Sequence, residues 1–189
     1  MFSLRRPSLS DLASVVATQA DCELTYAEHG ATAGLMPRGY HHDQWEADLG
    51  RFDQAAFDRL GAALLGWQVQ RGVGVSVFPD EPVQPGLTFA FWFRLAGVFV
   101  TAAGRVVYVT SEADRRGFAY GTLPQHPEQG EEAFHLVREG SGMLFRVTAF
   151  SRPRHPLARL GAPVSRLVQL RMNQAYLRAM RSATASLKP

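Results

Sequence analysis

The spacing of hydrophobic positions changes along the chain from helical to strand-like and back to helical. After Asp53, apolar residues recur every three or four positions, which predicts an amphipathic helix over 53–72. Alternation at every second position follows and is clearest in LTFAFWFRL, residues 87–95, where Leu and Phe occupy one face. The same criterion predicts strands over 40–51, 73–78, 98–101, 105–110, 117–123, 131–138 and 143–150, with a hairpin turn about 139–142.

A second helical pattern runs from about residue 155 to 181. Its apolar stripe consists of Leu160, Val164, Leu167, Val168, Met172 and Ala175. An antiparallel sheet that curves must cover its apolar concave face, and the last helix is the only predicted element long enough to do so. The order of elements therefore predicts an α+β helix-grip fold, a curved antiparallel β-sheet of about seven strands wrapped around a long C-terminal helix.

Length and composition fit one domain over 1–189, since the chain has 189 residues, of which 46% are apolar and 20% are charged. Residues 1–23 form an N-terminal extension, in which Ser8 or Ser10 followed by Asp11 predicts the cap of a short helix over about 11–20. The single cysteine, Cys22, excludes an intramolecular disulfide and fits a reducing compartment. No apolar run reaches the length of a membrane span. We therefore expect a cytoplasmic protein.

Charge is distributed unevenly along the chain. Residues 140–189 carry nine basic and no acidic residues, whereas residues 1–139 carry eleven basic and seventeen acidic residues. A basic C-terminal helix could dock on anionic lipid or nucleic acid. However, its arginines are spread around the helix and no aromatic residues alternate with them, so we interpret it as a solvated helix and expect no nucleic-acid partner.

Four segments carry a resemblance to a known family: LTYAEHGATAG (24–34), GYHHDQWEADLGR (39–51), GFAYGTLPQHPEQGEEAF (117–134) and VTAFSRP (147–153). The chain resembles the uncharacterised protein family 0548, which occurs in bacteria and plants. That family is similar to the helix-grip superfamily of the birch pollen allergen and the lipid-binding START domains. The resemblance implies the helix-grip fold and an apolar ligand in a cavity under the last helix. A few members of the superfamily are cyclases or hydrolases, and the resemblance implies no catalytic residue here.

The segment 121–134 concentrates protonatable side chains in one connection, among them His126, Glu128 and Glu131. These three are candidate general acid–base groups, and the alternative is a structural loop closed by its own hydrogen bonds. In either case we expect His126 to pair with a carboxylate that raises its pKa. Because Glu131 and Glu132 are consecutive in a strand, at most one of them faces a cavity.

Other strands place polar residues among apolar ones, as the lining of a small-molecule pocket does. An inward Arg146 would bind an anionic head group or a carboxylate such as Glu132, and the alternative is that these polar residues face solvent on the convex side. The candidate ligand-binding residues are Tyr40, His42, Tyr120, Thr122, His126, Glu132, Phe134, Arg146, Thr148 and Phe150.

The sequence contains no recognised metal-ligand spacing, nucleophile motif or phosphate-binding loop, so we expect neither metal nor cofactor. It favours a binding protein for a small apolar or amphipathic molecule. The alternatives are an enzyme that uses His126, Glu128 and Glu131, or a docking module that acts through the basic helix. The oligomeric state stays open.

Overall fold

The computed structural model describes residues 1–154 and 162–185, with side chains in the last segment from residue 166 onward. Its strands form one antiparallel sheet in the order β2-β8-β7-β6-β5-β4-β3, with the short β1 beside β5. The strands are β1 Phe2–Ser3, β2 His41–Arg51, β3 Ser76–Phe78, β4 Thr88–Leu95, β5 Val98–Ser111, β6 Arg115–Thr122, β7 Glu128–Glu139 and β8 Gly142–Pro153.

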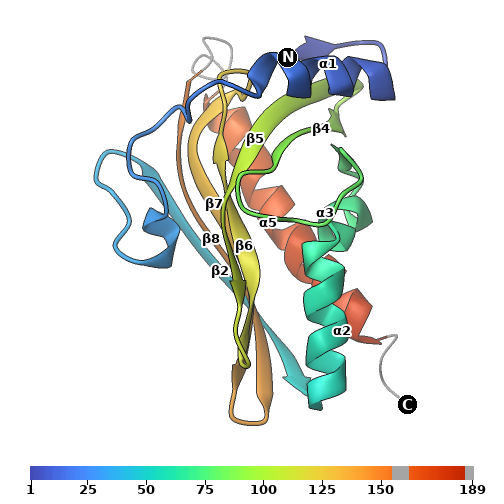
Figure 1. Cartoon of the computed structure of the whole chain (residues 1–189), viewed down its shortest axis with the longest axis vertical. Coiled ribbons are helices and arrows are strands. Elements are labelled where there is room, and N and C mark those ends of the chain that lie inside the picture. Colours follow the sequence, from blue (N-terminus) through green and yellow to red (C-terminus); the bar gives the residue numbers. More distant parts are fainter. Residues whose placement is uncertain (155–161, 186–189) are drawn as a thin grey trace.

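The α-helices lie on the concave side of the sheet and across one of its ends (Figure 1). The helical elements are α1 Leu9–Gln19, the 3-10 turn η1 Ala31–Ala33, α2 Gln54–Leu65, α3 Gln68–Gly72 and α5 Ala162–Ala185. The sheet bends around α5, with α2 and α3 beside it. The predicted α+β helix-grip architecture is confirmed.

The N-terminal helix forms where the sequence predicts it. Ser8 caps α1 by accepting a hydrogen bond from the Asp11 backbone N–H, and the Asp11 side chain accepts one in return from the Ser8 backbone. Asp53 caps α2 by accepting from the Ala56 N–H at 2.8 Å. Both helix starts therefore rest on local capping chemistry.

The predicted helix over 53–72 is wrong in one respect, because it breaks into α2 and α3. Trp67 adopts a left-handed conformation with φ 61°. That turn buries the indole against Phe89 and Phe118 and lets its Nε1–H donate to the Glu81 carbonyl at 3.0 Å. Tertiary packing of one aromatic side chain thus overrides the helical period.

The predicted strands 98–101 and 105–110 are one continuous strand, β5. They join through Gly104, where an added Cβ would lie 2.9 Å from the Phe89 ring. Glycine there admits the close packing of β4 side chains over β5, so it does not interrupt the strand.

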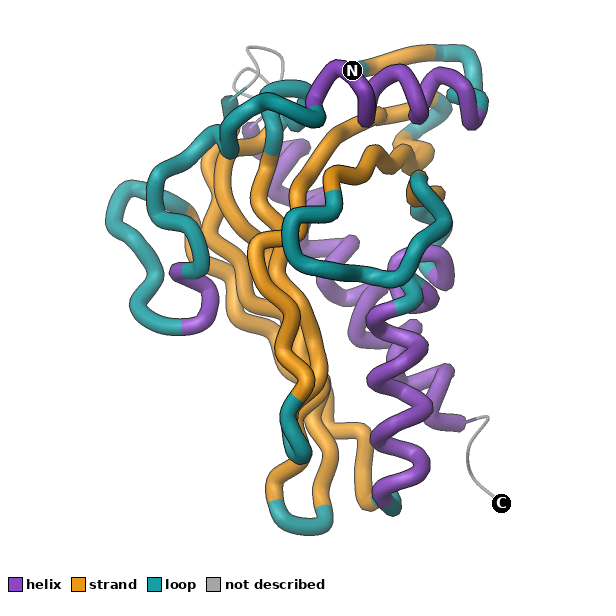
Figure 2. Tube along the Cα trace, in the orientation of Figure 1, coloured by secondary structure: helices purple, strands orange, loops and turns teal. Residues whose placement is uncertain are grey.

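Cross-strand register defines the two faces of the sheet. Asp43, Ala149, Glu132, Tyr120 and Val106 lie in one row across β2, β8, β7, β6 and β5, on the concave face. The next row on that face, from Trp45 to Phe118, continues into the hydrophobic core. The alternate residues point to the convex face. Figure 2 shows the segment with η1 against that outer face, opposite α2 and α5.

The helix α5 is rotated relative to the predicted stripe. Leu167 is 45% exposed, whereas Val168 and Met172 face the sheet side. The buried positions of α5 are Asn173, Tyr176, Leu177, Met180 and Thr184. Leu160 lies outside the described residues, as does the side chain of Val164. No helix in the described part of the chain is both long enough and apolar enough to cross a membrane.

Candidate functional site

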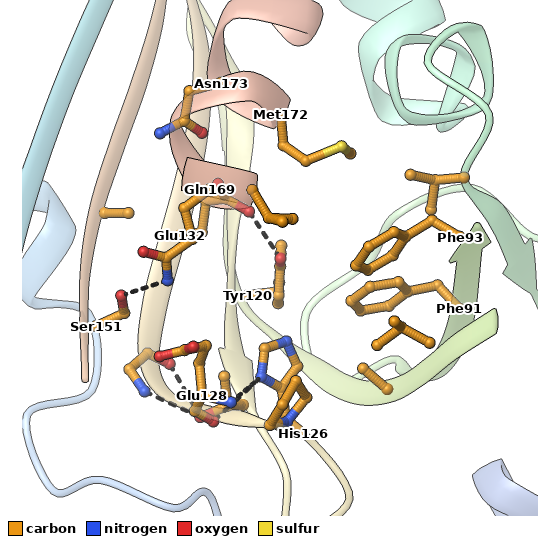
Figure 3. Close-up of a pocket in the computed structure, with 18 of the residues that line it drawn as sticks. Phe91, Phe93, Tyr120, His126, Glu128, Glu132, Ser151, Gln169, Met172 and Asn173 are labelled. Atoms are coloured by element: carbon orange, nitrogen blue, oxygen red, sulfur yellow. Dashed lines mark hydrogen bonds between the residues drawn. The ribbon is translucent and has the colours of Figure 1, made fainter. Parts of the chain in front are cut away.

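A cavity of about 320 Å³ lies between the concave face of the sheet and α5. One side of it is apolar, and Figure 3 shows Phe91 and Phe93 there, across the cavity from Glu132. The apolar lining residues are Phe2, Val75, Phe91, Phe93, Leu95, Val100, Ala102, Pro127, Ala149, Phe150, Val168 and Met172. The alternation of LTFAFWFRL produces this wall because every second side chain of β4 points inward.

Glu132 and Tyr120 form the centre of the polar end (Figure 3). The Tyr120 hydroxyl donates to Glu132 Oε2 at 2.7 Å. Burial raises the pKa of Glu132 to about 7, which the hydrogen bond from Tyr120 only partly offsets. Burial, together with the charge of Glu132, also holds the pKa of Tyr120 well above its usual value. The pair therefore places a carboxyl group that titrates near neutral pH inside an apolar cavity.

His126 lies at the loop end of the cavity and is fixed by the backbone. Its Nδ1 lies 3.0 Å from the Glu128 backbone N and 3.1 Å from the Glu128 carbonyl oxygen, so both polar groups of that residue hold the ring. Its ring centroid lies 5.9 Å from that of Phe91. Burial lowers the pKa of His126 to about 4. The expected carboxylate partner and raised pKa are therefore wrong, because the partner is a backbone amide and the site is desolvated.

Glu128 is the second carboxyl group at this end. Its Oε2 is buried without a hydrogen-bond partner among the described residues. Burial raises the pKa of Glu128 to about 7, and the charge of Arg166 opposes this only in part. Glu128 thus has a side-chain polar atom in the cavity region that no described group satisfies.

Asp43 and Arg166 close the cavity on the β2 side. Asp43 is 6% exposed, and its carboxylate takes both terminal nitrogens of Arg166, one at 2.7 Å. The hydrogen bonds that Arg166 donates to Asp43 raise the pKa of Arg166 further. Beside this pair, Gln169 Nε2 donates to Ser151 Oγ at 3.1 Å. The bidentate pair of Asp43 and Arg166 fixes α5 to the edge strand β2.

The sequence analysis considered only the apolar stripe of α5 and did not predict that polar residues of this helix line the cavity. Arg166, Gln169, Asn173 and Tyr176 recur at spacings of three and four, and all but Arg166 are lining residues of the cavity. A polar stripe with helical period beside an apolar one was the available signal.

The structure brings part of the expected set together. Tyr120, Thr122, His126, Glu128 and Glu132 line the cavity. Phe134, also expected there, is fully buried one layer deeper, and its ring packs edge-on against Tyr176.

Arg146 is not in the cavity. It lies on the convex face, bonded to Glu46 and, at 2.7 Å, to Glu139. Thr148 shares that face, since it alternates with the inward Val147 and Ala149. The anchor for an anionic head group expected at Arg146 is therefore corrected, because strand parity points this side chain away from α5.

Tyr40, His42 and Phe150 belong to the convex side as well. His42 bonds the Pro37 carbonyl at 2.7 Å, and the Arg152 guanidinium lies 4.5 Å from the Tyr40 ring centroid. Phe150 borders the cavity, yet its ring packs edge-on against Tyr26 and Tyr40. These side chains hold the 21–40 segment to the sheet.

Glu131 also holds the 21–40 segment to the sheet. It is 2% exposed and accepts hydrogen bonds from the Tyr26 hydroxyl at 2.6 Å, the Gly30 N–H at 2.7 Å and the Thr32 N–H at 3.0 Å. The Thr32 hydroxyl donates to it as well. Its oxygens are occupied on the face opposite Glu132, so Glu131 leaves the candidate acid–base set.

Within the described ranges 1–154 and 162–185, no three His, Cys, Asp or Glu side chains lie close enough together to bind a metal ion.

A family model for a domain of unknown function, DUF1990, matches residues 25–179. The chain belongs to the DUF1990 family. A "UPF0548 protein" of Deinococcus radiodurans is 33% identical over 195 residues, covering 95% of this chain and 97% of the relative.

Solved structures share the fold of this DUF1990 protein. A START superfamily protein from Mycobacterium smegmatis superposes with a TM-score of 0.54 at 12% identity, covering 79% of this chain and 100% of that one. The structure of Ara h 8.0201 superposes with a TM-score of 0.53 at 15% identity, covering 78% of this chain and 99% of that one. These likenesses show the helix-grip fold, and at these identities they show the fold alone.

Proposed function

We propose that this DUF1990 protein binds a small, largely apolar molecule in the cavity between the sheet and α5. The observation that carries the proposal is the cavity itself, about 320 Å³ in volume, with an aromatic and aliphatic wall and a few polar groups at one end. That volume and that composition are typical of small-molecule sites. Phe91, Phe93 and Met172 supply apolar contact area, and Glu132 and Tyr120 supply orientation.

The fold supports the proposal independently of the residues. The helix-grip superfamily, to which the solved neighbours connect this chain, commonly binds apolar ligands in the corresponding cavity. A cytoplasmic location, and the absence of a nucleic-acid partner, stay predictions from the sequence.

A dye-binding experiment tests the cavity. An apolar fluorescent dye should bind the native protein at micromolar concentration, and Met172→Trp should weaken binding at least about tenfold because the indole fills the cavity. Leu167→Trp is the matched control on the same helix, since Leu167 is 45% exposed and outside the cavity. Native mass spectrometry of the purified protein would show a retained ligand directly.

Two results would contradict the proposal: no dye binding by the native protein, or equal losses in the two tryptophan variants. Equal losses would place the dye on the surface of α5.

An enzyme that uses acid–base chemistry is the second candidate, and a specific observation favours it. Glu128 and Glu132 both have pKa values raised to about 7 by burial next to an apolar cavity. Carboxyl groups with such pKa values are suited to proton transfer near neutral pH. The reaction would use Glu132 and Glu128, with His126 neutral, in place of the set that included Glu131.

A further inference from the structure

The polar end of the cavity has hydrogen-bond acceptors that the described residues leave unused. Asn173 and Tyr176 are 3% and 7% exposed, line the cavity, and make no side-chain hydrogen bond to a described residue. They lie three residues apart on α5, so their side chains share one face of the helix. Figure 3 shows the Asn173 carboxamide extending from α5 on the side of Glu132. Buried polar groups without partners point to a ligand that satisfies them.

Glu132 adds a charged acceptor to this pair. Its Oε2 is taken by Tyr120, and no described residue donates to its other oxygen. Glu132 and Tyr176 both line this cavity, Glu132 from β7 and Tyr176 from α5. Glu132, Asn173 and Tyr176 together offer three acceptor oxygens, and a primary ammonium group has three N–H donors.

The charge at this end of the cavity is also one-sided. Glu128 carries a second carboxyl whose Oε2 is buried and unpartnered in the described chain. Of the cations nearby, Arg166 is engaged by both oxygens of Asp43, and the N-terminal ammonium of Met1 donates to the Thr101 carbonyl. His126 is held neutral by its desolvated position. An anionic head group would therefore meet two carboxyl groups and no unpaired cation among the described lining residues.

We propose that the ligand of this cavity is an amphipathic amine, with its ammonium group on Glu132, Asn173 and Tyr176 and its apolar part against Phe91 and Phe93. Glu128 supplies further negative charge near the head group. This inference rests on the proposed binding function and specifies the ligand class that the binding site takes.

The proposal has a defined pH dependence. The titratable and charged groups around the head-group position are Asp43 on β2, Tyr120 on β6, His126 just before β7, Glu128 and Glu131 on β7, Arg166 and Tyr176 on α5, and the N-terminal ammonium of Met1. Of these, Glu128, like Glu132 itself, titrates near pH 7, while His126 titrates near pH 4. Binding an ammonium ion requires Glu132 to release its proton to solvent. Affinity for the amine should therefore rise from pH 5.5 to pH 8.

Isothermal titration calorimetry with octylamine, octan-1-ol and octanoate tests the inference with three head groups on one chain length. At pH 7.5 we expect octylamine to bind roughly ten- to a hundredfold more tightly than octanoate, since one charge-assisted hydrogen bond is worth about that factor. Glu132→Gln should remove most of this preference and leave octan-1-ol nearly unchanged. Glu112→Gln is the matched control, because Glu112 is exposed and outside the cavity.

The outcomes separate this inference from the proposed function. Octan-1-ol binding without a preference for the amine overturns the inference and leaves the function standing, as does an equal loss of amine and alcohol in Glu132→Gln. Failure of all three compounds at millimolar concentration overturns both. The pH series on the native protein is independent of the variant's folding. Amine affinity that is flat or falls with rising pH overturns the inference.

Discussion

Glu131 and Glu132 are neighbours in the chain and lie in opposite settings. Glu131, on the convex face, accepts hydrogen bonds from Tyr26, Gly30 and Thr32, all in the segment that covers that face. Glu132, on the concave face, accepts one hydrogen bond from Tyr120 and otherwise faces the cavity. The period of a β-strand alone separates the two roles.

The contrast explains how one strand can serve stability on one side and binding on the other. A carboxylate whose oxygens are filled by fixed donors has no capacity left for a ligand, and it ties an otherwise irregular segment to the sheet. A carboxyl group that is buried and has only one hydrogen-bond partner keeps a raised pKa, and its second oxygen is free to accept a hydrogen bond from a ligand. Substitutions of the two residues should therefore have opposite consequences.

Glu131→Gln should have the largest effect on stability. The new amide can accept through one atom only, and its NH₂ group would face N–H and O–H donors from Gly30, Thr32 and Tyr26. We expect a loss of about 3 kcal/mol in the free energy of unfolding, because buried donors lose a charged acceptor. Urea unfolding monitored by circular dichroism measures it. A loss comparable to that of an exposed glutamate such as Glu112 would show that the 21–40 segment does not depend on this carboxylate.

Glu132→Gln should change stability in the opposite direction, and by an amount that depends on pH. The pKa of Glu132 is about 7 in the folded protein, whereas a solvent-exposed glutamate has a pKa of 4.5. The contribution of Glu132 to the free energy of unfolding is therefore fully present below pH 4.5, and it is lost as the pH rises through 7. Glutamine mimics the protonated form, so the variant should gain about 3 kcal/mol over the native protein at pH 8.

Parallel urea titrations of Glu132→Gln and the native protein at pH 4.5 and pH 8 measure this difference. A difference that is the same at both pH values, or larger at pH 4.5, would contradict a raised pKa at Glu132.

The fold was predictable because its signals are local. Alternation in 87–95, the caps at Ser8 and Asp53, and the glycine-containing turn at 139–142 each follow from neighbouring residues. The break at Trp67 was not predictable, since it depends on Phe89 and Phe118, which are distant in the sequence. The rotation of α5 likewise depends on which side chains the assembled concave face accepts.

The candidate site was predictable in part, for a related reason. The loop segment placed His126 and Glu128 correctly at the cavity, and strand parity stated that Glu131 and Glu132 diverge. Parity does not say which face is concave, so Arg146 and Glu132 were assigned to the same side although each belongs to a different one. The predicted direction of the His126 pKa shift was wrong because desolvation lowers this pKa, and the depth of burial cannot be predicted from neighbouring residues.

Arg146 offers the smallest expected effect and the sharpest check on which face binds. Its side chain is 39% exposed and pairs with Glu46 and Glu139, whose side chains are 47% and 57% exposed. Such pairs lose most of their Coulomb energy to solvent screening, so Arg146→Met should lower the free energy of unfolding by at most about 1 kcal/mol. Octylamine and octanoate should bind this variant as they bind the native protein. A selective loss of octanoate binding would return the anionic anchor to Arg146 and would reverse the assignment of the two faces, because a side chain on the convex side has no path to the cavity under α5.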